Sequence, residues 1–504
     1  MSHGIYSRSS INYLPTITTS YAMDHSESSI LSPTGSLVKQ IASQRPQLQS
    51  TKSPSTFYRN IEEALDVRRA TQSLFSIVQN NWQSNDAVDF CSNDYLSWNS
   101  TGLIRSRLLA ELSRYPEFSV AAGGSRVMEG NYPYIEETEL EIASCHGAEA
   151  GLIVSSAFEG NVMVWSALPR PGDVIIYDAL VHASTHEGME RSLAIQRTEF
   201  RHNDIESFRE ALLSVQESQP LIKQRKRSIL VAVESVYSME GDVCPLAELV
   251  EVANEVSQGS GNIQFVMDET HSAGIIGPNG TGLVCELGLE AEIAVRVHTY
   301  SKAMGACGGI VLGSETIKCA LINFARSSIY SASPPFPFVA AIRAGHRLLG
   351  TPEARKSQDS VQYLARTFFG SLTSHTLWPT AQKKNLLSVP LSDGWEERPF
   401  LTHIVTIWTR QKYIYWLYLH LLSHSFYVLP VKHPIVPAGE SRLRITFHAE
   451  NTADQVSSLV EHIFGWVEEI LAIEEGRSDT KITRAAGEVY GWMRQEGLKG
   501  YGMV

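Results

Sequence analysis

A single lysine in a glycine-rich turn offers the most specific chemistry in this sequence. Lys302 lies within Thr299–Gly309, between two apolar runs of strand length, and three glycines follow it there. Glycines let the backbone turn tightly and approach a ligand closely. A lysine desolvated in such a pocket has a lowered pKa and can form a Schiff base, whereas an exposed lysine in a surface turn is the alternative. No GxxxxGK[ST] motif is present, which excludes a P-loop.

Asp268 and His271 form a second pair of reactive side chains, directly after another apolar run. A carboxylate at that place can pair with a protonated pyridine nitrogen, the role expected of an aspartate that holds pyridoxal phosphate (PLP). A helix N-cap is the structural alternative, because Asp is common where a strand turns into a helix. Metal binding is a third interpretation, weakened by the lack of a third ligand nearby in the sequence.

Three further positions extend this set of candidate residues. The segment Ser155–Phe158 leads into an expected helix start, where unbonded backbone N–H groups can bind a phosphate. His182 could stack on a planar ring, although a hydrogen-bonded core histidine is the simpler interpretation. Arg444 could bind a carboxylate through its bidentate guanidinium, with a surface ion pair as the alternative.

Most of these residues follow strand-like segments of one region, residues 111–345. Short apolar runs alternate there with longer helical patterns, which predicts a mostly parallel α/β sheet covered on both faces. The runs are 151–154, 174–177, 229–233, 263–267, 294–297 and 309–312. Ligands of open α/β sheets bind outside the carboxyl ends of the strands. Aspartate, histidine, hydroxyl and lysine side chains follow strand after strand here, which a purely structural domain would not need.

The rest of the chain divides by composition and pattern. We expect a disordered or targeting segment at 1–56, an N-terminal arm at 57–110, a smaller α+β domain at 346–475 and a loosely held tail at 476–504. The elements expected there are helices at about 61–78, 413–419 and 453–473 and strands at 88–96, 404–408 and 442–447.

Composition excludes several classes of function. The chain has 504 residues and a formal net charge of −12 without a basic block, so it is a poor candidate for binding nucleic acid or an anionic membrane. The length is ample for a large core. Six scattered cysteines form no CxxC pair, which argues against a zinc site and a disulfide scaffold and favours a reducing compartment.

The sequence favours a cytoplasmic location, with a mitochondrial one as the alternative. Residues 1–56 are rich in Ser and Thr and lack the apolar block of a secretory signal, and mitochondrial transit peptides are usually richer in arginine. The most apolar stretch, 413–419, is far short of the roughly 20 residues that cross a bilayer. We therefore expect no membrane span.

Taken together, the motifs resemble the α-oxoamine synthase family of PLP enzymes, and within it the 8-amino-7-oxononanoate synthase branch. The similar segments occur in the family's order and spacing: ALDVRRA at 64–70, SNDYL at 92–96, GGSR at 123–126, HAS at 182–184, SMEGD at 238–242, DETHSAG at 268–274, SKAMG at 301–305, IYS at 329–331, VPAG at 436–439 and RLR at 442–444. The resemblance implies an α/β, PLP-dependent transferase fold of type I, with a large, mostly parallel seven-stranded sheet domain and a smaller α+β C-terminal domain.

The resemblance also implies roles for single residues. Lys302 would hold PLP covalently and act as acid and base, and His182, Asp268 and His271 would be further catalytic residues. The cofactor site would comprise Lys302, Asp268 at the pyridine nitrogen, His271 and Ser238 near the phenolic oxygen, His182 over the ring, and Ala157, Phe158 and Thr299 at the phosphate. Arg444 would bind the carboxylate of an amino-acid substrate, and Asn93 would lie near that substrate. No metal is implied.

The implied reaction is the decarboxylative condensation of an amino acid with an acyl thioester, carried on coenzyme A or an acyl carrier protein, to give an α-amino ketone. Family members are homodimers, so a homodimer is expected, with Ser331 and Ser333 near the phosphate of the other subunit. Another PLP reaction, such as aminotransfer or aldol cleavage, is one alternative. A non-catalytic subunit of a related synthase is another, which the presence of Lys302 argues against.

Four residues depart from the family pattern. Ile135 and Phe75 stand where relatives of the oxononanoate type often have His and Arg, Lys432 stands where Arg is common, and Ala157 replaces a frequent glycine. A lysine is a point charge and does not reproduce the bidentate fork of arginine. The PLP set is intact, but the acyl donor stays open between a pimeloyl thioester and another fatty or polyketide thioester, in biotin or in secondary metabolism.

Overall fold

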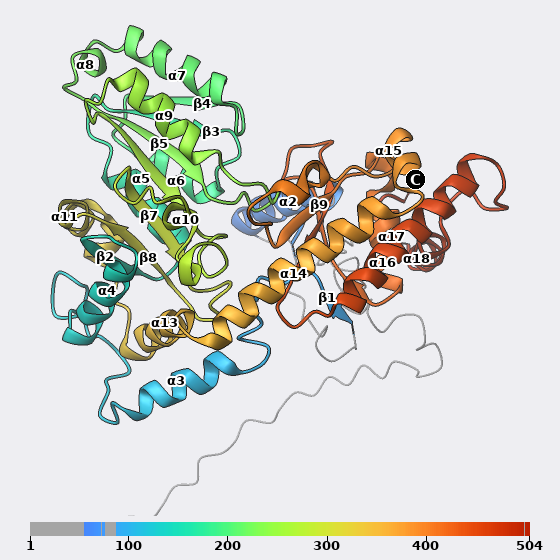
Figure 1. Ribbon diagram of the computed structural model, residues 1–504, viewed down its shortest axis with the longest axis horizontal. Coiled ribbons are helices and arrows are strands. Elements are labelled where there is room, and N and C mark those ends of the chain that lie inside the picture. Colours follow the sequence, from blue (N-terminus) through green and yellow to red (C-terminus); the bar gives the residue numbers. More distant parts are fainter. Residues whose placement is uncertain (1–54, 72, 76–86, 498, 504) are drawn as a thin grey trace, which may run out of the picture.

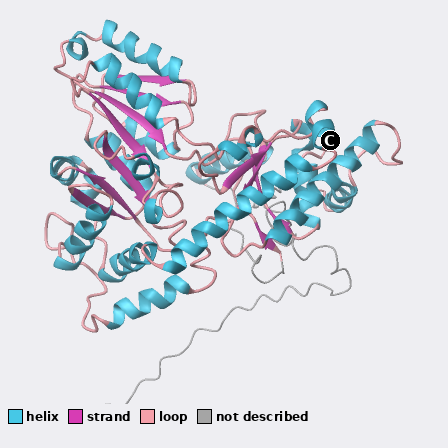
Figure 2. Cartoon of the chain, in the orientation of Figure 1, coloured by secondary structure: helices cyan, strands magenta, loops and turns pink. Residues whose placement is uncertain are grey.

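The computed structural model describes residues 55–71, 73–75, 87–497 and 499–503. Most of the expected disordered or targeting segment, 1–56, and the end of the expected helix 61–78 lie outside these residues. Figure 1 shows two masses, with the long helix α14 (Pro352–Ser374) running from one to the other. Figure 2 shows the strands gathered mainly in the larger mass.

The larger mass is built on a seven-stranded sheet in the order β2-β8-β7-β6-β5-β3-β4. The strands are β2 (Ala150–Val154), β3 (Val174–Asp178), β4 (Gln196–Phe200), β5 (Ile229–Glu234), β6 (Ile263–Asp268), β7 (Ile293–Thr299) and β8 (Gly309–Gly313). All pairings are parallel except those of β8, which runs antiparallel to β2 and β7. The predicted α/β fold with a mostly parallel seven-stranded sheet is confirmed.

All the apolar runs expected in this region are strands in the structure. One strand of the seven-stranded sheet was not predicted from the sequence. β4 contains a single apolar residue in the sequence QRTEF, and only Phe200 at its end is buried. It is an edge strand that pairs with β3 alone. Hydrophobic periodicity could not reveal it, because its side chains are mostly outside the core.

The two faces of the sheet are covered by different helices, as the alternation of strand side chains requires. Ile229 and Val231 belong to the core shared with α7 (Ile205–Ser218) and α9 (Leu246–Ser257). Leu230 and Ala232 belong to the opposite core, shared with α5 (Ala157–Ala167). The other helices of this mass are α3 (Leu103–Ser113), α4 (Pro133–Cys145), α6 (Ala183–Glu190), α8 (Pro220–Lys223), α10 (Leu283–Leu287), α11 (Glu315–Phe324), α12 (Arg326–Tyr330) and α13 (Phe336–Leu349).

The smaller mass has a three-stranded antiparallel sheet in the order β11-β12-β9. Its elements are β9 (Ile404–Ile407), β11 (Leu429–Val431), β12 (Arg442–Thr446), α15 (Trp378–Lys383), α16 (Ile414–Ser423), α17 (Ala453–Glu474) and α18 (Arg484–Gln495). The expected apolar stretch 413–419 is the buried core of α16. Across the described ranges, none of the helices combines the length and the apolar character that crossing a bilayer requires.

The N-terminal arm joins this smaller mass. α2 (Thr56–Ala70) precedes β1 (Val88–Asp89), which pairs in parallel with β10 (Phe426–Tyr427). We expected a strand running into a polar turn at 88–96; the strand is two residues long and bends and turns follow it. The Asp89 carboxylate accepts the backbone N–H groups of Cys91 and Ser92, which turns the chain out of the strand.

Residues 476–504, expected to be a loosely held tail, contain a packed helix. Tyr490 and Met493 of α18 are buried in the same core as α16, and the Tyr490 hydroxyl donates to the carbonyl of Tyr501 at 2.5 Å. The buried positions recur at helical spacing on one face. The expectation was wrong for the described part of this segment, because that face has a partner that only the folded chain supplies.

His202, in the turn after β4, lies between two carboxylates, one at the end of β3 and one in the turn after β5. The Nδ1 of His202 lies 2.9 Å from Asp178, and its Nε2 lies 2.8 Å from Asp242. Burial lowers the pKa of His202, but the hydrogen bonds to Asp178 and Asp242 outweigh it and raise the pKa to about 10. The protonated histidine therefore stabilises the folded state.

We predict that this stabilisation depends on pH. A pKa raised from an ordinary value of 6.5 to about 10 contributes fully below pH 6.5 and is lost as the pH rises through about 10. The difference in Tm between the wild type and His202→Gln should therefore be largest near pH 6 and shrink toward pH 10. A difference that does not change with pH would contradict a charged His202.

Candidate active site

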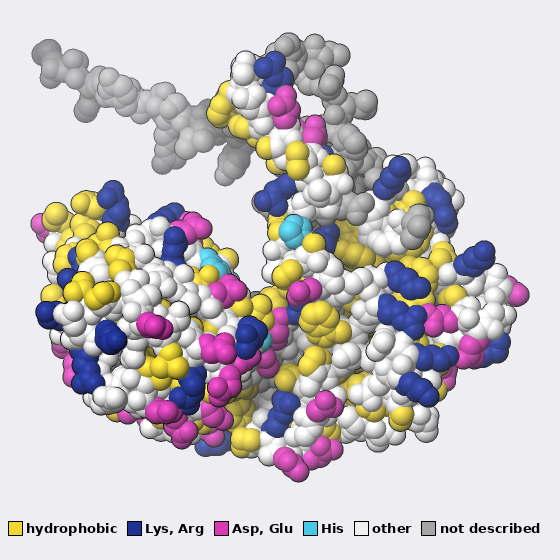
Figure 3. Space-filling view, turned by 90° about the horizontal axis from the view of Figure 1, so that it is seen from above, with side chains coloured by type: hydrophobic (Ala, Val, Ile, Leu, Met, Phe, Trp, Pro, Cys, Tyr) yellow, Lys and Arg dark blue, Asp and Glu magenta, His cyan; other side chains and the backbone are white. Residues whose placement is uncertain are grey.

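The candidate residues gather where the parallel strands end, on the side of the sheet that faces the smaller mass. β3 ends at Asp178, β5 at Glu234, β6 at Asp268 and β7 at Thr299. The carboxyl ends of parallel strands share one edge, where α/β proteins bind ligands. The space-filling view shows the surface hollowed between the two masses, with histidine side chains at the rim (Figure 3).

Lys302 follows β7 and its amine is held inside this region. Its Nζ lies 2.8 Å from Nε2 of His271. Burial lowers the pKa of Lys302 to about 8, Asp268 opposes that shift, Arg444 adds to it, and Glu234 opposes it. The amine can therefore be neutral or protonated near physiological pH, as covalent and acid–base chemistry of lysine requires.

His271 connects the lysine to a hydrogen-bonded series of side chains. Tyr95 places its hydroxyl 2.9 Å from His271 Nδ1 and 2.9 Å from the Asn93 side-chain oxygen, which can only accept. The Tyr95 hydroxyl therefore donates to Asn93 and accepts from Nδ1–H of His271. Nε2 of His271 is left as the acceptor for Lys302. Burial, followed by the charges of Lys302 and Arg444, holds the pKa of His271 well below its usual value, so the ring is neutral.

Arg444 reaches the same group of side chains from β12. It is 3% exposed, and its Nη2 donates to the Asn93 oxygen at 3.2 Å and to the Tyr95 oxygen at 3.3 Å. Its Nε is buried and has no hydrogen-bond partner among the described residues. A buried unpaired donor of a charged group is costly, so this guanidinium is suited to binding an anion such as a carboxylate.

Asp268 is oriented by hydrogen bonds to both of its carboxylate oxygens. Asn161 of α5 donates to one oxygen at 2.7 Å, and the backbone N–H of Thr270 donates to the other at 2.9 Å. Asn161 also donates to Ser184 at 3.0 Å, whose hydroxyl lies 2.7 Å from Nδ1 of His182. This series ties the ends of β6 and β3 to one helix.

His182 is the N-cap residue of α6 and is exposed beside these groups. Burial lowers the pKa of His182, and Asp268 opposes that shift. Its backbone N–H donates to the fully buried Glu234. Burial, followed by the charge of Asp268, raises the pKa of Glu234 well above its usual value. The Phe158 ring meets the His182 ring edge to face, with 6.1 Å between the ring centroids.

The start of α5 offers an anion site beside the end of β7. Ala157 is its first residue and has an ordinary helical conformation, and Ser156 caps the helix by accepting the N–H of Glu159 at 3.1 Å. The first N–H groups of a helix have no intrahelical acceptor and bind anions. Thr299 ends β7, is buried, and places its hydroxyl 2.9 Å from that of Ser301. A Cβ at Gly309 would lie 3.0 Å from the Ala157 nitrogen, so glycine permits this close approach.

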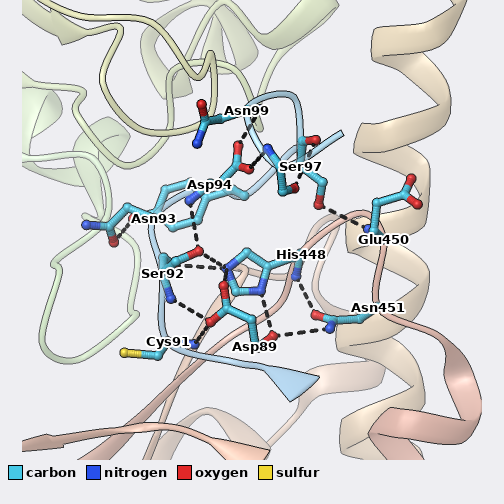
Figure 4. A network of polar contacts seen from close by, with 12 residues as sticks. Asp89, Cys91, Ser92, Asn93, Asp94, Ser97, Asn99, His448, Glu450 and Asn451 are labelled. Atoms are coloured by element: carbon cyan, nitrogen blue, oxygen red, sulfur yellow. Dashed lines mark hydrogen bonds and ion pairs between the residues drawn. The ribbon is translucent and has the colours of Figure 1, made fainter. Parts of the chain in front are cut away.

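A polar network fixes the loop that presents Asn93 and Tyr95 (Figure 4). The Nδ1–H of His448 donates to the carbonyl of Asp89 at 3.0 Å, and its Nε2 lies 3.0 Å from the Ser92 hydroxyl. The backbone N–H of Glu450 donates to the Ser97 hydroxyl at 3.2 Å. The loop is therefore attached to the segment that follows β12, the strand of Arg444.

The structure brings most of the sequence-predicted residues into one region and adds four. The contacts described above join Lys302, His271, Asp268, His182, Arg444 and Asn93. The neighbouring helix start and strand end comprise Ala157, Phe158 and Thr299. Ser238 is half-buried in the turn after β5. Sequence reasoning assigned no role to Tyr95, Asn161, Glu234 or His403. Tyr95 and Glu234 carried a signal, since one lies in the SNDYL motif and the other ends a strand. Asn161 inside a helix and His403 in the other domain carried none.

His403 is a further polar residue of the site, because it packs directly against Tyr95. It is fully buried beside Tyr95, with 4.0 Å between the ring centroids, and neither ring nitrogen has a hydrogen-bond partner within the described part of the chain. Burial, followed by the charge of Arg444, holds the pKa of His403 well below its usual value. Its neutral ring therefore offers one unsatisfied donor and one unsatisfied acceptor.

These residues fit PLP. A buried amine of lowered pKa suits the aldehyde, the fixed Asp268 carboxylate suits a protonated pyridine nitrogen, and the start of α5 suits the phosphate. The unpaired Nε of Arg444 provides for a further anion.

Comparison with known proteins places the chain among enzymes of this kind. A family model, aminotransferase class I and II, matches residues 85–463. An aminoacyl transferase named sphA from Byssochlamys spectabilis is 52% identical over 442 residues, which cover 88% of this chain and 94% of that protein. An 8-amino-7-oxononanoate synthase from Emericella nidulans is 38% identical and covers 76% of this chain and 90% of that protein.

Solved structures agree with the sequence comparisons. A serine palmitoyltransferase variant with PLP aligns with a TM-score of 0.64 and 26% identity, covering 76% of this chain and 87% of that one. The shared fold and the sequence identity over most of the length lead to one conclusion. The chain belongs to the aminotransferase class I and II family and, within it, to the PLP-dependent α-oxoamine synthases.

Proposed function

We propose that this enzyme condenses an amino acid with an acyl thioester and releases carbon dioxide, giving an α-amino ketone. One observation carries the proposal: the buried amine of Lys302 and the guanidinium of Arg444, whose Nε has no partner among the described residues, are joined by the series His271–Tyr95. The amine suits a cofactor aldehyde, and the guanidinium suits the carboxylate of the substrate attached to it. A carbon–carbon bond forms between Cα and the thioester carbonyl carbon, the thiol leaves, and the former carboxylate departs as carbon dioxide.

PLP, when bound, withdraws electrons from the Cα of the amino acid. We assign Lys302, Asp268, His271, His182, Ser238, Ala157, Phe158 and Thr299 to holding it. In this assignment the Asp268 carboxylate keeps a proton on the pyridine nitrogen. Asn161 and the Thr270 N–H keep that carboxylate in place, because they occupy an oxygen each.

Lys302 is the proposed acid and base at Cα. Its pKa near 8 lets Nζ accept a proton and return it near physiological pH. The neutral His271 accepts a hydrogen bond from Nζ and so orients the amine without adding charge. Arg444 and Asn93 are assigned to the part of the site that binds the substrate carboxylate. The Tyr95 hydroxyl hydrogen-bonds to both of them and so holds them in place relative to each other.

The acyl donor is proposed to be apolar, such as a fatty or polyketide thioester. Ile135 is fully buried among apolar side chains, and Phe75 is apolar, so two positions that often carry His and Arg in oxononanoate-type relatives carry no charge here. Coenzyme A and an acyl carrier protein are both suitable carriers.

A second copy of the chain is proposed to complete the cofactor site. A cavity of about 310 Å³ next to the start of α5 is lined by Arg126, Ser155, Ser331 and Ser333, among others. The hydroxyl of Ser333 is buried and lacks a partner within the described residues. The α-oxoamine synthase resemblance, in which active sites lie at the subunit interface, is consistent with a homodimer.

The first prediction concerns the covalent link. Borohydride reduction of the purified protein should trap a cofactor-sized mass on Lys302, and Lys302→Ala should lose both that mass and the yellow colour. Lys384→Ala, which removes a lysine of an exposed ion pair with Glu475, is the matched control and should keep both. Peptide mass spectrometry reads out the site. An adduct on another side chain would refute the assignment.

The second prediction separates condensation from aminotransfer. Carbon dioxide should be released from a labelled amino-acid carboxylate only when amino acid and thioester are both present. A panel of alanine, glycine and serine against fatty, polyketide and pimeloyl thioesters identifies the pair. Formation of a keto acid without any thioester would favour an aminotransferase instead.

The third prediction concerns carboxylate binding. Arg444→Lys keeps the charge but not the fork, so it should lower kcat/KM for the amino acid roughly 10- to 100-fold, the size expected when a charge-assisted hydrogen bond is lost. KM for the thioester should change little. Arg477→Lys, in an exposed pair with Glu475, is the control. Equal losses for both substrates would point to a folding defect rather than lost carboxylate binding.

A further inference from the structure

Three histidines of the smaller mass lie together outside the candidate active site. His420 and His424 are four residues apart at the end of α16, and four residues make one turn of a helix. His462 comes from α17, which packs beside them. One ring nitrogen from each residue lies within 4.8 Å of the others. Figure 1 shows α16 and α17 in the smaller mass, away from the large sheet.

His424 is held in a single tautomer. Its Nδ1 lies 2.7 Å from the carbonyl oxygen of His420, which can only accept, so Nδ1 carries the proton. The lone pair is therefore on Nε2. Metal-bound histidines commonly donate their other N–H to a backbone carbonyl in this way, which orients the ring and strengthens the ligand.

A carboxylate lies near His420, at ion-pair distance but too far for a hydrogen bond. The Nδ1 of His420 lies 3.8 Å from an oxygen of Glu469 on α17, and the His420 side chain is 11% exposed. The second oxygen of Glu469 accepts the backbone N–H of Arg484 at 2.6 Å, so the carboxylate is fixed. Nε2 of His420 is buried and has no hydrogen-bond partner among the described residues. A buried unpaired ring nitrogen needs an explanation.

The three rings are packed closely. The centroid of the His424 ring lies 4.5 Å from that of His420 and 4.2 Å from that of His462. Small movements of the side chains can therefore bring one nitrogen from each ring to a common ion.

We propose that His420, His424 and His462 form a site for a divalent transition metal, with zinc as the best-suited ion, that links α16 to α17. Imidazole nitrogens bound to one zinc ion lie about 3.4 Å apart, given the usual zinc–nitrogen length and tetrahedral angle. Side-chain rotations that move the ring nitrogens by about an ångström bring them from their present separation to this distance. Three ligands leave a fourth position for water. The site does not depend on the condensation reaction.

The ligand set explains why cysteine spacing did not reveal this site. The sequence analysis argued against zinc because the cysteines are scattered, and all six are free in the structure. Imidazole is an equally common zinc ligand. The pair His420–His424 has the helical i, i+4 spacing of a two-histidine ligand pair. Its third member is 38 residues further on and joins the pair only through the packing of α17 on α16.

The test loads the full-length holoenzyme with zinc chloride, removes free metal by gel filtration and measures bound zinc by mass spectrometry of the element. We expect one zinc per chain and a higher Tm than that of the chelator-treated protein, because a ligand that binds the folded state stabilises it. His424→Gln combined with His462→Gln should lose both effects. His375→Gln removes another histidine that packs on α17, where it stacks on Phe464, and should lose neither.

Three measurements on proteins with all three histidines keep the test independent of how the double variant folds. Zinc-edge X-ray absorption of the loaded wild type should show three imidazole ligands, and cobalt loading should give the visible bands of a four-coordinate site. Glu469→Gln, which can still accept the Arg484 N–H, should weaken zinc binding roughly 10- to 100-fold. No zinc in the wild type, zinc retained in the double variant, or a spectrum without imidazole ligands would each overturn the proposal.

Discussion

The burial of one amine governs the arrangement of the candidate active site. Lys302 is removed from water beside His271, and this desolvation lowers its pKa to about 8. A buried ammonium must be balanced, and the Asp268 carboxylate supplies compensating charge from the end of the neighbouring strand. Glu234, whose pKa burial raises well above its usual value, lies at the end of the next strand. His271 stays neutral and so adds no further positive charge beside the amine. The strand order of the sheet is what brings these four groups to one edge.

The second half of the site comes from elements far away in the chain. Arg444 lies on β12 of the smaller sheet, and Asn93 and Tyr95 lie on the N-terminal loop that the His448 network attaches to the same region (Figure 4). The proposed substrate side of the site is thus carried by the smaller mass and the proposed cofactor side by the larger one. Their junction, crossed by α14, is where the two halves must stay aligned.

The smaller mass also differs from the larger one in what holds it together. The helices α17 and α18 pack against the apolar helix α16, and residues of β9 and β12 belong to the same core. The helix α18 completes that core from a segment whose composition resembles a surface tail. The three histidines lie within this helical group, between α16 and α17, where a bound ion would act on the packing of the domain that carries Arg444.

The sequence by itself determined the fold class, the apolar strands and the identity of the chemical residues, because these depend on local periodicity and on motifs such as SKAMG and DETHSAG. It also pointed to Lys302, Asp268 and His271, since each directly follows a strand. Only the tertiary structure decided which atom donates each hydrogen bond in the series from Lys302 to Asn93, and which groups donate hydrogen bonds to Asp268. It likewise decided the pairing of β4, the burial of α18 and the meeting of His462 with His420. Each of these depends on contacts between segments distant in the chain, which no local pattern records.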